Sequence, residues 1–221
     1  EEKMNKFLKY ELNSYLLGRT TERKKEMPLY RVENQGYIHY RKGSLVMYAL
    51  ADYIGEENLN HSLQQYVKKV AFQGAPYTNS IEFLHYIRGA TPDSLQYLVT
   101  DMFENITLYE NKATEATYEA LKDGKYKVTL TVDAKKLYAD SLGTESEAQM
   151  NDWVDVGVLA RKKVEGHWQD SPIYLKKHKL KAGENKFEFV VDEKPAKAGV
   201  DPYNMLIDRN PSDNTKTLSG S

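Results

Sequence analysis

The chain has 221 residues, enough for one large domain or for two modest ones that each bury a core. Lys and Arg total 31 against 32 for Asp and Glu, and this balance excludes the basic footprint of a nucleic-acid-binding protein, so no nucleic acid partner is expected. The absence of cysteine excludes disulfides, thiolate nucleophiles and cysteine-ligated zinc, although it leaves the cellular compartment open.

No apolar run approaches the roughly 18 residues that a membrane-spanning helix needs. The first residues, EEKMNKFLKYEL, have neither the basic start nor the apolar core of a signal peptide, so the chain is expected to be soluble. A helical pattern is already under way at these residues, and the chain closes on SDNTKTLSGS, which is typical of a flexible tail. We therefore interpret the sequence as a piece of a longer protein.

Apolar residues at helical spacing dominate the first half of the chain. The first stripe covers residues 4–15, and a second covers residues 46–54 and ends before a glycine. The pattern repeats over residues 56–72 and 81–89. A Thr-Pro pair then predicts the start of a helix over residues 92–103, because proline at the first helical position loses only an N–H that has no helical partner.

From about residue 118 the apolar period changes to two, which is typical of strands with one buried face. Valines and other apolar residues alternate with polar ones over residues 126–132, 152–161 and 185–192, and a weaker strand is predicted over residues 172–180. Turn sequences such as KDGK and KAGEN separate these segments, and no helical pattern stands between them.

These patterns predict an α+β protein of two domains. Residues 1–110 are expected to form an antiparallel helical array with short loops, and residues 118–210 an antiparallel β-sandwich. Residues 211–221 are expected to be a flexible tail. No internal repeat is visible in the sequence.

A self-contained metal site is not predicted. The histidines are His39, His61, His85, His167 and His178, and no two of them stand in an H-E-x-x-H or H-x-H arrangement. A complete site needs three or four convergent ligands, so we assign no metal ligand and interpret His61 and His85 as helix-surface residues. The oxygen-rich segment DPYNMLIDRNPSDN lacks the D-x-D-x-D-G spacing of a calcium loop, and a network of turn side chains is favoured there.

The stretch YIHYRKGSLVMYAL, residues 37–50, contains the candidate catalytic residue, Tyr40. With 17 tyrosines in the chain, a single one is more often a helix-entry residue that packs its ring and hydrogen-bonds its hydroxyl. The context distinguishes Tyr40, since Tyr-Arg-Lys-Gly (40–43) precedes an apolar helix that ends at Ile-Gly-Glu (54–56), and another helix follows.

This order resembles a segment of the aminopeptidase N and leukotriene hydrolase family of zinc metallopeptidases, in which Tyr, an acidic or polar residue, Lys and Gly precede such a helix and turn. The resemblance covers most of the chain. Residues 1 to about 108 look like the C-terminal helical part of a thermolysin-like catalytic domain, and residues 118–210 like the β-sandwich that follows it. The resemblance implies a zinc-dependent aminopeptidase that cleaves N-terminal residues from peptides, with Tyr40 as the donor to the oxyanion of the tetrahedral intermediate.

The departures from the family pattern concern the metal. The H-E-x-x-H zinc helix, the third zinc ligand in an Asn-Glu-Gly context and the Gly-x-Met-Glu-Asn strand are absent and are expected upstream of Glu1. Arg41 stands where the family often has an acidic residue, and the family's extra C-terminal helical domain is missing. Zinc is therefore expected in the full-length protein and not in this chain, which is expected to be inactive alone.

The resemblance also implies partners and a location. The partners are a peptide substrate and the upstream catalytic lobe of the same polypeptide, both in the full-length protein. The compact form is known in bacteria and is sometimes joined to an ABC transporter permease, which favours the periplasmic or extracytoplasmic face of the membrane and leaves a cytoplasmic location and attachment through upstream segments open. Two alternatives remain, a non-catalytic scaffold or interaction module and a degenerate peptidase-like domain attached to a membrane transporter.

Overall fold

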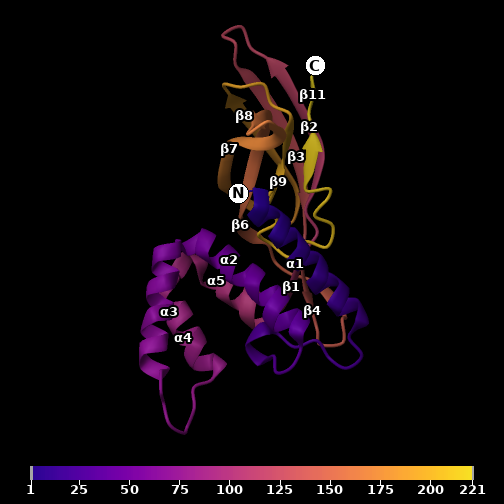
Figure 1. The fold of residues 1–221 in the computed structure, drawn as a ribbon. Coiled ribbons are helices and arrows are strands. Elements are labelled where there is room, and N and C mark those ends of the chain that lie inside the picture. Colours follow the sequence, from indigo (N-terminus) through magenta and orange to yellow (C-terminus); the bar gives the residue numbers. More distant parts are fainter. Residues whose placement is uncertain (1, 221) are drawn as a thin grey trace. The chain divides into compact units, whose positions relative to one another are not determined.

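The structure is a computed structural model that describes residues 2–220 (Figure 1). Helices occupy the first half of the described chain and strands the second, so the α+β class predicted from the sequence is confirmed. Within that range no helix is both long enough and apolar enough to cross a membrane. The α-helices are α1 (Glu2–Thr21), α2 (Gly43–Ile54), α3 (Glu56–Val70), α4 (Ser80–Ala90) and α5 (Gln96–Val99).

Four shorter helical segments accompany these helices. Two are 3₁₀-helices, η1 (Leu29–Arg31) and η3 (Asp93–Leu95), and two are π-helices, η2 (Tyr37–Lys42) and η4 (Thr100–Glu104). The helix predicted over residues 92–103 is therefore divided into a 3₁₀, an α and a π segment. Gln96 ties its start to the preceding helix, since the Gln96 side chain donates hydrogen bonds to the carbonyl oxygens of Arg88 and Thr91 at 2.9 and 2.7 Å.

Local sequence signals fix where several helices begin and end. Gly55 joins α2 to α3 with a φ of +88°, a conformation that side chains rarely adopt, and its N–H donates to the carbonyl oxygen of Ala51 at 2.9 Å. Asn79 caps α4, because its side-chain oxygen accepts hydrogen bonds from the N–H groups of Ile81 and Glu82, each at 3.0 Å. α3 and α4 then lie side by side (Figure 1).

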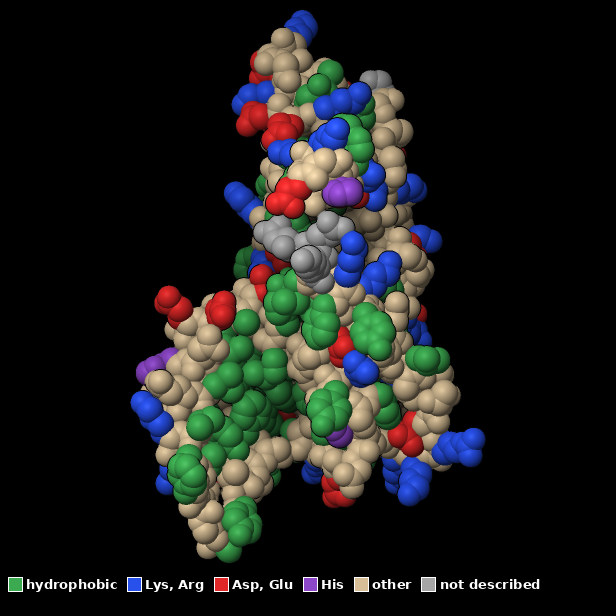
Figure 2. All heavy atoms as spheres, in the orientation of Figure 1, with side chains coloured by type: hydrophobic (Ala, Val, Ile, Leu, Met, Phe, Trp, Pro, Cys, Tyr) green, Lys and Arg blue, Asp and Glu red, His purple; other side chains and the backbone are tan. Residues whose placement is uncertain are grey.

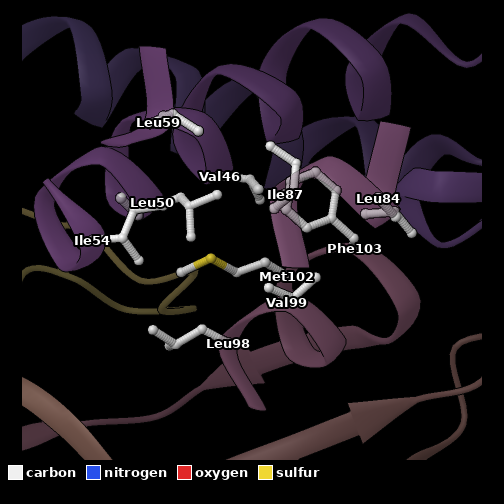
Figure 3. Packing of buried hydrophobic residues seen from close by; sticks show 11 residues of the cluster. Val46, Leu50, Ile54, Leu59, Leu84, Ile87, Leu98, Val99, Met102 and Phe103 are labelled. Atoms are coloured by element: carbon white, nitrogen blue, oxygen red, sulfur yellow. The ribbon is translucent and has the colours of Figure 1, made fainter. Parts of the chain in front are cut away.

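The apolar stripes predicted on these helices meet in one core (Figure 3). The side chains converge from α2, α3, α4, α5 and η4, and Leu50 and Ile87 are fully buried at its centre. The buried members of the cluster are Val46, Ala49, Leu50, Ile54, Leu59, Leu84, Ile87, Leu98, Val99, Met102 and Phe103. Because buried apolar area is the main stabilising contribution to folding, this cluster fixes α2, which directly follows the segment that contains residue 40.

The chain divides into two compact units. Unit 1 contains the described residues up to Thr107, with Tyr138–Ser146 and Met205–Ile207, and unit 2 contains Leu108–Leu137, Glu147–Asn204 and the residues from Asp208 onward. The sequence pattern does not indicate the two later segments of unit 1. The segment Tyr138–Ser146 is held there by hydrogen bonds, since the N–H of Glu26 donates to the carbonyl oxygen of Ser141 at 2.9 Å and the hydroxyl of Tyr138 donates to Asp101 Oδ1 at 2.6 Å. Met205 packs against the buried core of the helices.

The strands form three mostly antiparallel sheets in the described residues. A three-stranded sheet has the order β1-β4-β5. Two four-stranded sheets have the orders β10-β9-β6-β7 and β11-β2-β3-β8. The strands are β1 (Ile106–Tyr109), β2 (Lys112–Ala120), β3 (Tyr126–Ala134), β4 (Lys136–Ala139), β5 (Glu145–Glu147), β6 (Asn151–Val164), β7 (His167–Lys181), β8 (Gly183–Val191), β9 (Lys197–Val200), β10 (Thr215–Thr217) and β11 (Ser219–Gly220).

The alternating patterns predicted from the sequence are confirmed at the centres of both four-stranded sheets. Val154, Val156 and Val158 of β6 are all buried, and so are the apolar residues of β3 at alternate positions. The C-terminal residues differ from the expected tail. Thr215 to Thr217 pair with β9, Ser219 and Gly220 pair with β2, and Leu218 between them is buried.

Candidate functional site

Tyr40 lies in the π-helix η2, immediately before α2. The residue is 71% exposed, and its hydroxyl has no hydrogen-bond partner among the residues that the structure describes. π-helical turns are rare and often occur at functional sites. Tyr40 therefore combines a fixed backbone with a hydroxyl that is free to donate.

The residues around Tyr40 anchor η2 firmly. Ile38 and Lys42 are buried in unit 1, on either side of it in the sequence. Arg41 Nη1 donates to Glu11 Oε1 at 2.7 Å, and the Arg41 guanidinium lies 5.3 Å from the ring centroid of Tyr10. Arg41 thus attaches η2 to α1 and has a structural role in unit 1.

Glycine is required where α1 meets η2. A Cβ on Gly18 would lie 2.4 Å from Cβ of Tyr37, a distance that real atoms do not reach. The absence of a side chain at Gly18 therefore lets the two helices approach closely. The ring of Tyr37 stacks on that of Tyr15, with centroids 6.0 Å apart, and so continues the contact.

Lys42 is a buried part of this support. It is 1% exposed, and its ammonium donates to the carbonyl oxygen of Asn105 at 3.2 Å. Burial lowers the pKa of Lys42 to about 8, although the negative charge of Glu26 acts in the opposite direction. Nζ also lies 5.8 Å from the ring centroid of Tyr15. The lysine of the Tyr-Arg-Lys-Gly motif therefore points into the protein.

A second set of buried polar groups surrounds Glu26. The hydroxyl of Tyr15 donates to Glu26 Oε1 at 2.5 Å, and Arg19 Nε donates to Oε2 at 2.6 Å. Burial raises the pKa of Tyr15 well above its usual value, and the charge of Glu26 adds to the effect. Tyr15 is therefore held as a neutral donor, whereas Tyr40 has no such partner.

His39 is the ring in contact with Tyr40. The two ring centroids are 4.4 Å apart with an angle of 57° between the planes. The Nδ1 atom of His39 is buried and has no hydrogen-bond partner in the described residues. A buried polar atom without a partner typically costs about 1–3 kcal/mol, so His39 Nδ1 is an uncommon feature of the fold. The sequence gives no indication of a role for His39, since a histidine next to a motif carries no periodic signal.

The described residues do not provide a metal centre. No group of three or more His, Cys, Asp or Glu side chains within residues 2–220 is arranged to hold a metal ion, so these residues do not fit a zinc site. His61 and His85 line a polar groove on α3 and α4, where the His61 ring bonds Gln65. His178 lies 2.7 Å from the hydroxyl of Tyr174 on β7.

The oxygen-rich segment near the C-terminus forms a network of turn side chains, as the sequence suggested. The N–H of Asn210 donates to Asp208 Oδ1 at 2.8 Å, and the Asn210 side chain donates to Asp213 Oδ2 at 2.8 Å. The hydroxyl of Ser212 donates to Asn210 Oδ1 at 2.6 Å. Burial raises the pKa of Asp208 to about 6, while hydrogen bonds from the N–H groups of Asn111 and Asn210 act against this rise.

Comparison with known proteins does not extend this description. A scan of protein-family models and a search of curated proteins found no match to the chain.

Proposed function

We propose that this chain is the C-terminal part of a zinc-dependent aminopeptidase related to aminopeptidase N and leukotriene hydrolase, in which Tyr40 is the catalytic residue. One observation carries the proposal. Tyr40 is exposed, its hydroxyl is unpaired among the described residues, and the π-helix that presents it is fixed on both sides by buried residues. A preorganised donor of this kind is what a reaction that develops negative charge on an oxygen requires.

The part assigned to Tyr40 is the donation of a hydrogen bond to the carbonyl oxygen of the peptide as that oxygen becomes an anion. The position is favourable because Ile38 and Lys42 hold the backbone, and the His39 ring limits the directions that the Tyr40 ring can take. Loss of one such donor lowers turnover by about 10²- to 10³-fold in enzymes where it has been measured. The proposal assigns zinc and its ligands to the upstream lobe of the full-length protein.

The remaining architecture fits this proposal. Unit 1 is taken as the helical end of a thermolysin-like catalytic domain, and the two four-stranded sheets of unit 2 as the β-sandwich that follows it. The peptide substrate and the upstream lobe are the proposed partners. An extracytoplasmic location in a bacterium, with attachment to a transporter permease, is part of the same proposal.

The test is hydrolysis of an aminoacyl nitroanilide by the protein extended upstream to include the missing lobe, at matched zinc content. We expect Tyr40→Phe to lower kcat by about a hundredfold or more with little change in KM. Tyr77→Phe is the matched control, since Tyr77 is 76% exposed and lies in the same unit, and it should keep full activity.

Two other outcomes would change the assignment. Equal activity of the wild type and Tyr40→Phe would remove the catalytic role of Tyr40. An extended protein that binds no zinc and hydrolyses nothing would favour the scaffold, interaction-module or degenerate-peptidase alternatives.

A further inference from the structure

A groove of about 270 Å³ opens on unit 1 next to the Tyr40 segment. We call it the His39 groove, and its lining includes Leu29, His39, Gly43, Met47, Phe83 and Phe103. Phe103 belongs to the buried core and Leu29, Met47 and Phe83 pack against it, so the groove has a firm apolar floor. Apolar side chains also gather on the visible face of this unit, where the surface is hollowed (Figure 2).

The polar groups of the groove are few and unpaired. Tyr30, His39 and Ser80 also contribute to its lining, and their side chains make no hydrogen bond within the described chain. No lining residue is Asp, Glu, Lys or Arg, so a charged ligand group would lose its hydration without compensation. An apolar wall with a small number of polar groups is the usual composition of a site for a small neutral ligand.

His39 offers one nitrogen to such a ligand. Its Nδ1 is buried and unpartnered, whereas Nε2 is unpartnered but not buried and is therefore the atom that a ligand can reach. A neutral imidazole places a proton on either nitrogen, so Nε2 acts as a donor or as an acceptor. A hydroxyl group matches both states because it donates and accepts, whereas an indole N–H only donates.

The volume limits the ligand further. At about 30 Å³ for each water-sized group, the groove holds roughly nine such groups, close to the number of non-hydrogen atoms in a tyrosine side chain. We propose that the His39 groove binds the phenol side chain of a tyrosine in a peptide that lies across Tyr40. Phenol binding stands on the groove alone, and the assignment to a peptide substrate rests on the proposed function.

The contact between the two rings connects the groove to the candidate catalytic residue. The His39 ring lines the groove and also lies 4.4 Å from the Tyr40 ring, centroid to centroid. A side chain held in the groove therefore lies against a ring that itself packs on the Tyr40 ring. The groove then selects which residue stands beside the bond that is cleaved.

The first experiment is a titration of the isotope-labelled 221-residue chain with p-cresol and with toluene, followed by amide NMR. We expect saturable shifts at residues around the groove, with a Kd for p-cresol on the order of 1 mM and toluene about fivefold weaker. His39→Phe keeps the ring but removes the nitrogens, so it should abolish the preference for p-cresol and leave toluene binding unchanged.

Gly43→Ala tests the location. Its Cβ would lie 3.8 Å from the carbonyl oxygen of Ile38 and 3.9 Å from Leu29 Cδ1, so the methyl group fits and reduces the space in the groove. We expect both ligands to bind about tenfold more weakly, because the added methyl group occupies space at the apolar floor of the groove and pushes the ligand outward. The control is Gly89→Ala on α4, where the added Cβ meets nothing within 4 Å, and binding should not change.

Three results would overturn the proposal: no saturable shifts at the groove, equal effects of Gly43→Ala and Gly89→Ala, or an unchanged preference for p-cresol in His39→Phe. The extended protein separates this proposal from the peptidase assignment. If hydrolysis depends on Tyr40 but p-cresol does not bind, the phenol-site proposal is wrong and the peptidase proposal stands. If p-cresol binds saturably but Tyr40→Phe does not change hydrolysis, the phenol-site proposal stands and the catalytic role of Tyr40 is contradicted.

Discussion

Each unit buries a lysine, a tyrosine and a carboxylate, but the two units pair these groups differently. In unit 2 the three groups form one cluster. Lys136 Nζ donates to Asp152 Oδ1 at 3.0 Å, and the hydroxyl of Tyr109 donates to Asp152 Oδ2 at 3.1 Å. The buried positive charge of Lys136 therefore has a buried negative charge in contact with it.

In unit 1 the carboxylate and the lysine do not pair. Tyr15 and Arg19 occupy both oxygens of Glu26, and Lys42 donates to the backbone carbonyl oxygen of Asn105. A carbonyl oxygen compensates the loss of hydration less well than a carboxylate, so burial lowers the pKa of Lys42 to about 8. Two buried lysines are thus held in different ways, one by a carboxylate and the other by a backbone carbonyl oxygen.

The largest effect is expected from Lys136→Met, which leaves the Asp152 carboxylate buried without a cation. We expect the free energy of unfolding of unit 2 to fall by about 3–5 kcal/mol. Urea unfolding followed by tryptophan fluorescence measures this unit selectively, since both tryptophans, Trp153 and Trp168, belong to it.

The matched control for this change is Lys135→Met. Lys135 is the neighbouring residue, its side chain is 41% exposed, and it pairs with Glu147 at 2.9 Å. We expect a much smaller loss for this pair than for Lys136→Met, because solvent screens an exposed ion pair. Similar losses in the two variants would contradict the distinction between buried and exposed pairs.

Lys42 predicts a pH dependence of the stability of unit 1. The folded state loses the Lys42 proton near pH 8 and the unfolded chain near its ordinary pKa of 10.5, so the unfolded chain binds more protons between these values. The free energy of unfolding of the wild type should therefore rise with pH in this window relative to Lys42→Met. The expected gain is up to about 3 kcal/mol, at about 1.4 kcal/mol for each pKa unit.

Chemical unfolding followed by far-ultraviolet circular dichroism, at several pH values in this window, measures the difference between the two proteins. Both proteins contain Tyr15 and Tyr37, whose pKa values are raised by burial, so their contributions cancel in the comparison. A difference that stays constant from pH 8 to 10.5 would show that Lys42 is not deprotonated in the folded state.

Removal of the hydroxyl groups of the buried tyrosines Tyr15 and Tyr109 should lower the free energy of unfolding by smaller amounts. Tyr15→Phe removes a 2.5 Å hydrogen bond to Glu26 and should cost about 2 kcal/mol, because hydrogen bonds to charged groups are the stronger ones. Tyr109→Phe removes a 3.1 Å bond to Asp152, which keeps Lys136, and should cost about 1 kcal/mol. Thermal unfolding measures both losses, and a larger loss for Tyr109→Phe would reverse the expected order.

Tyr40→Phe should have the smallest effect on stability. The ring is 71% exposed and the hydroxyl has no partner in the described residues, so we expect a change within about 0.5 kcal/mol. The same thermal unfolding measurement checks it. A loss of several kcal/mol would show that Tyr40 supports the fold, and a loss of activity in that variant would then have a structural cause.

Local patterns in the sequence predicted much of the fold. The helical stripes and the alternating valines of β6 were readable because each depends on the spacing of neighbouring residues. The predicted ends of the strands were less accurate than their existence. β2 begins at Lys112, whereas strands were expected from about residue 118, because a segment such as KATEAT has few buried residues to mark a face. The pairing of Thr215–Thr217 with β9 joins distant parts of the chain and leaves no local signal.

At the candidate site, the sequence identified Tyr40 through the order of residues around it, and its role remains a prediction. The burial of Lys42 could not be predicted, since lysine is almost always exposed and its partner, Asn105, is distant in the chain. The π-helical form of η2 was equally hidden, because one additional residue in a turn scarcely changes the apolar spacing. The His39 groove is lined by residues of η1, α4 and η4 that are far apart in the sequence, so it could not be predicted without the folded structure.

The division of the chain also has a consequence for biosynthesis. Unit 1 includes Tyr138–Ser146 and Met205–Ile207, so its polypeptide is complete only when nearly the whole sequence has left the ribosome. Until residues 138–141 have been synthesised, the backbone N–H of Glu26 lacks the Ser141 oxygen and Asp101 lacks the Tyr138 hydroxyl, and Met205–Ile207 follow only later. The helical part, although synthesised first, must therefore finish folding late, and a protein truncated after residue 110 would retain this immature form.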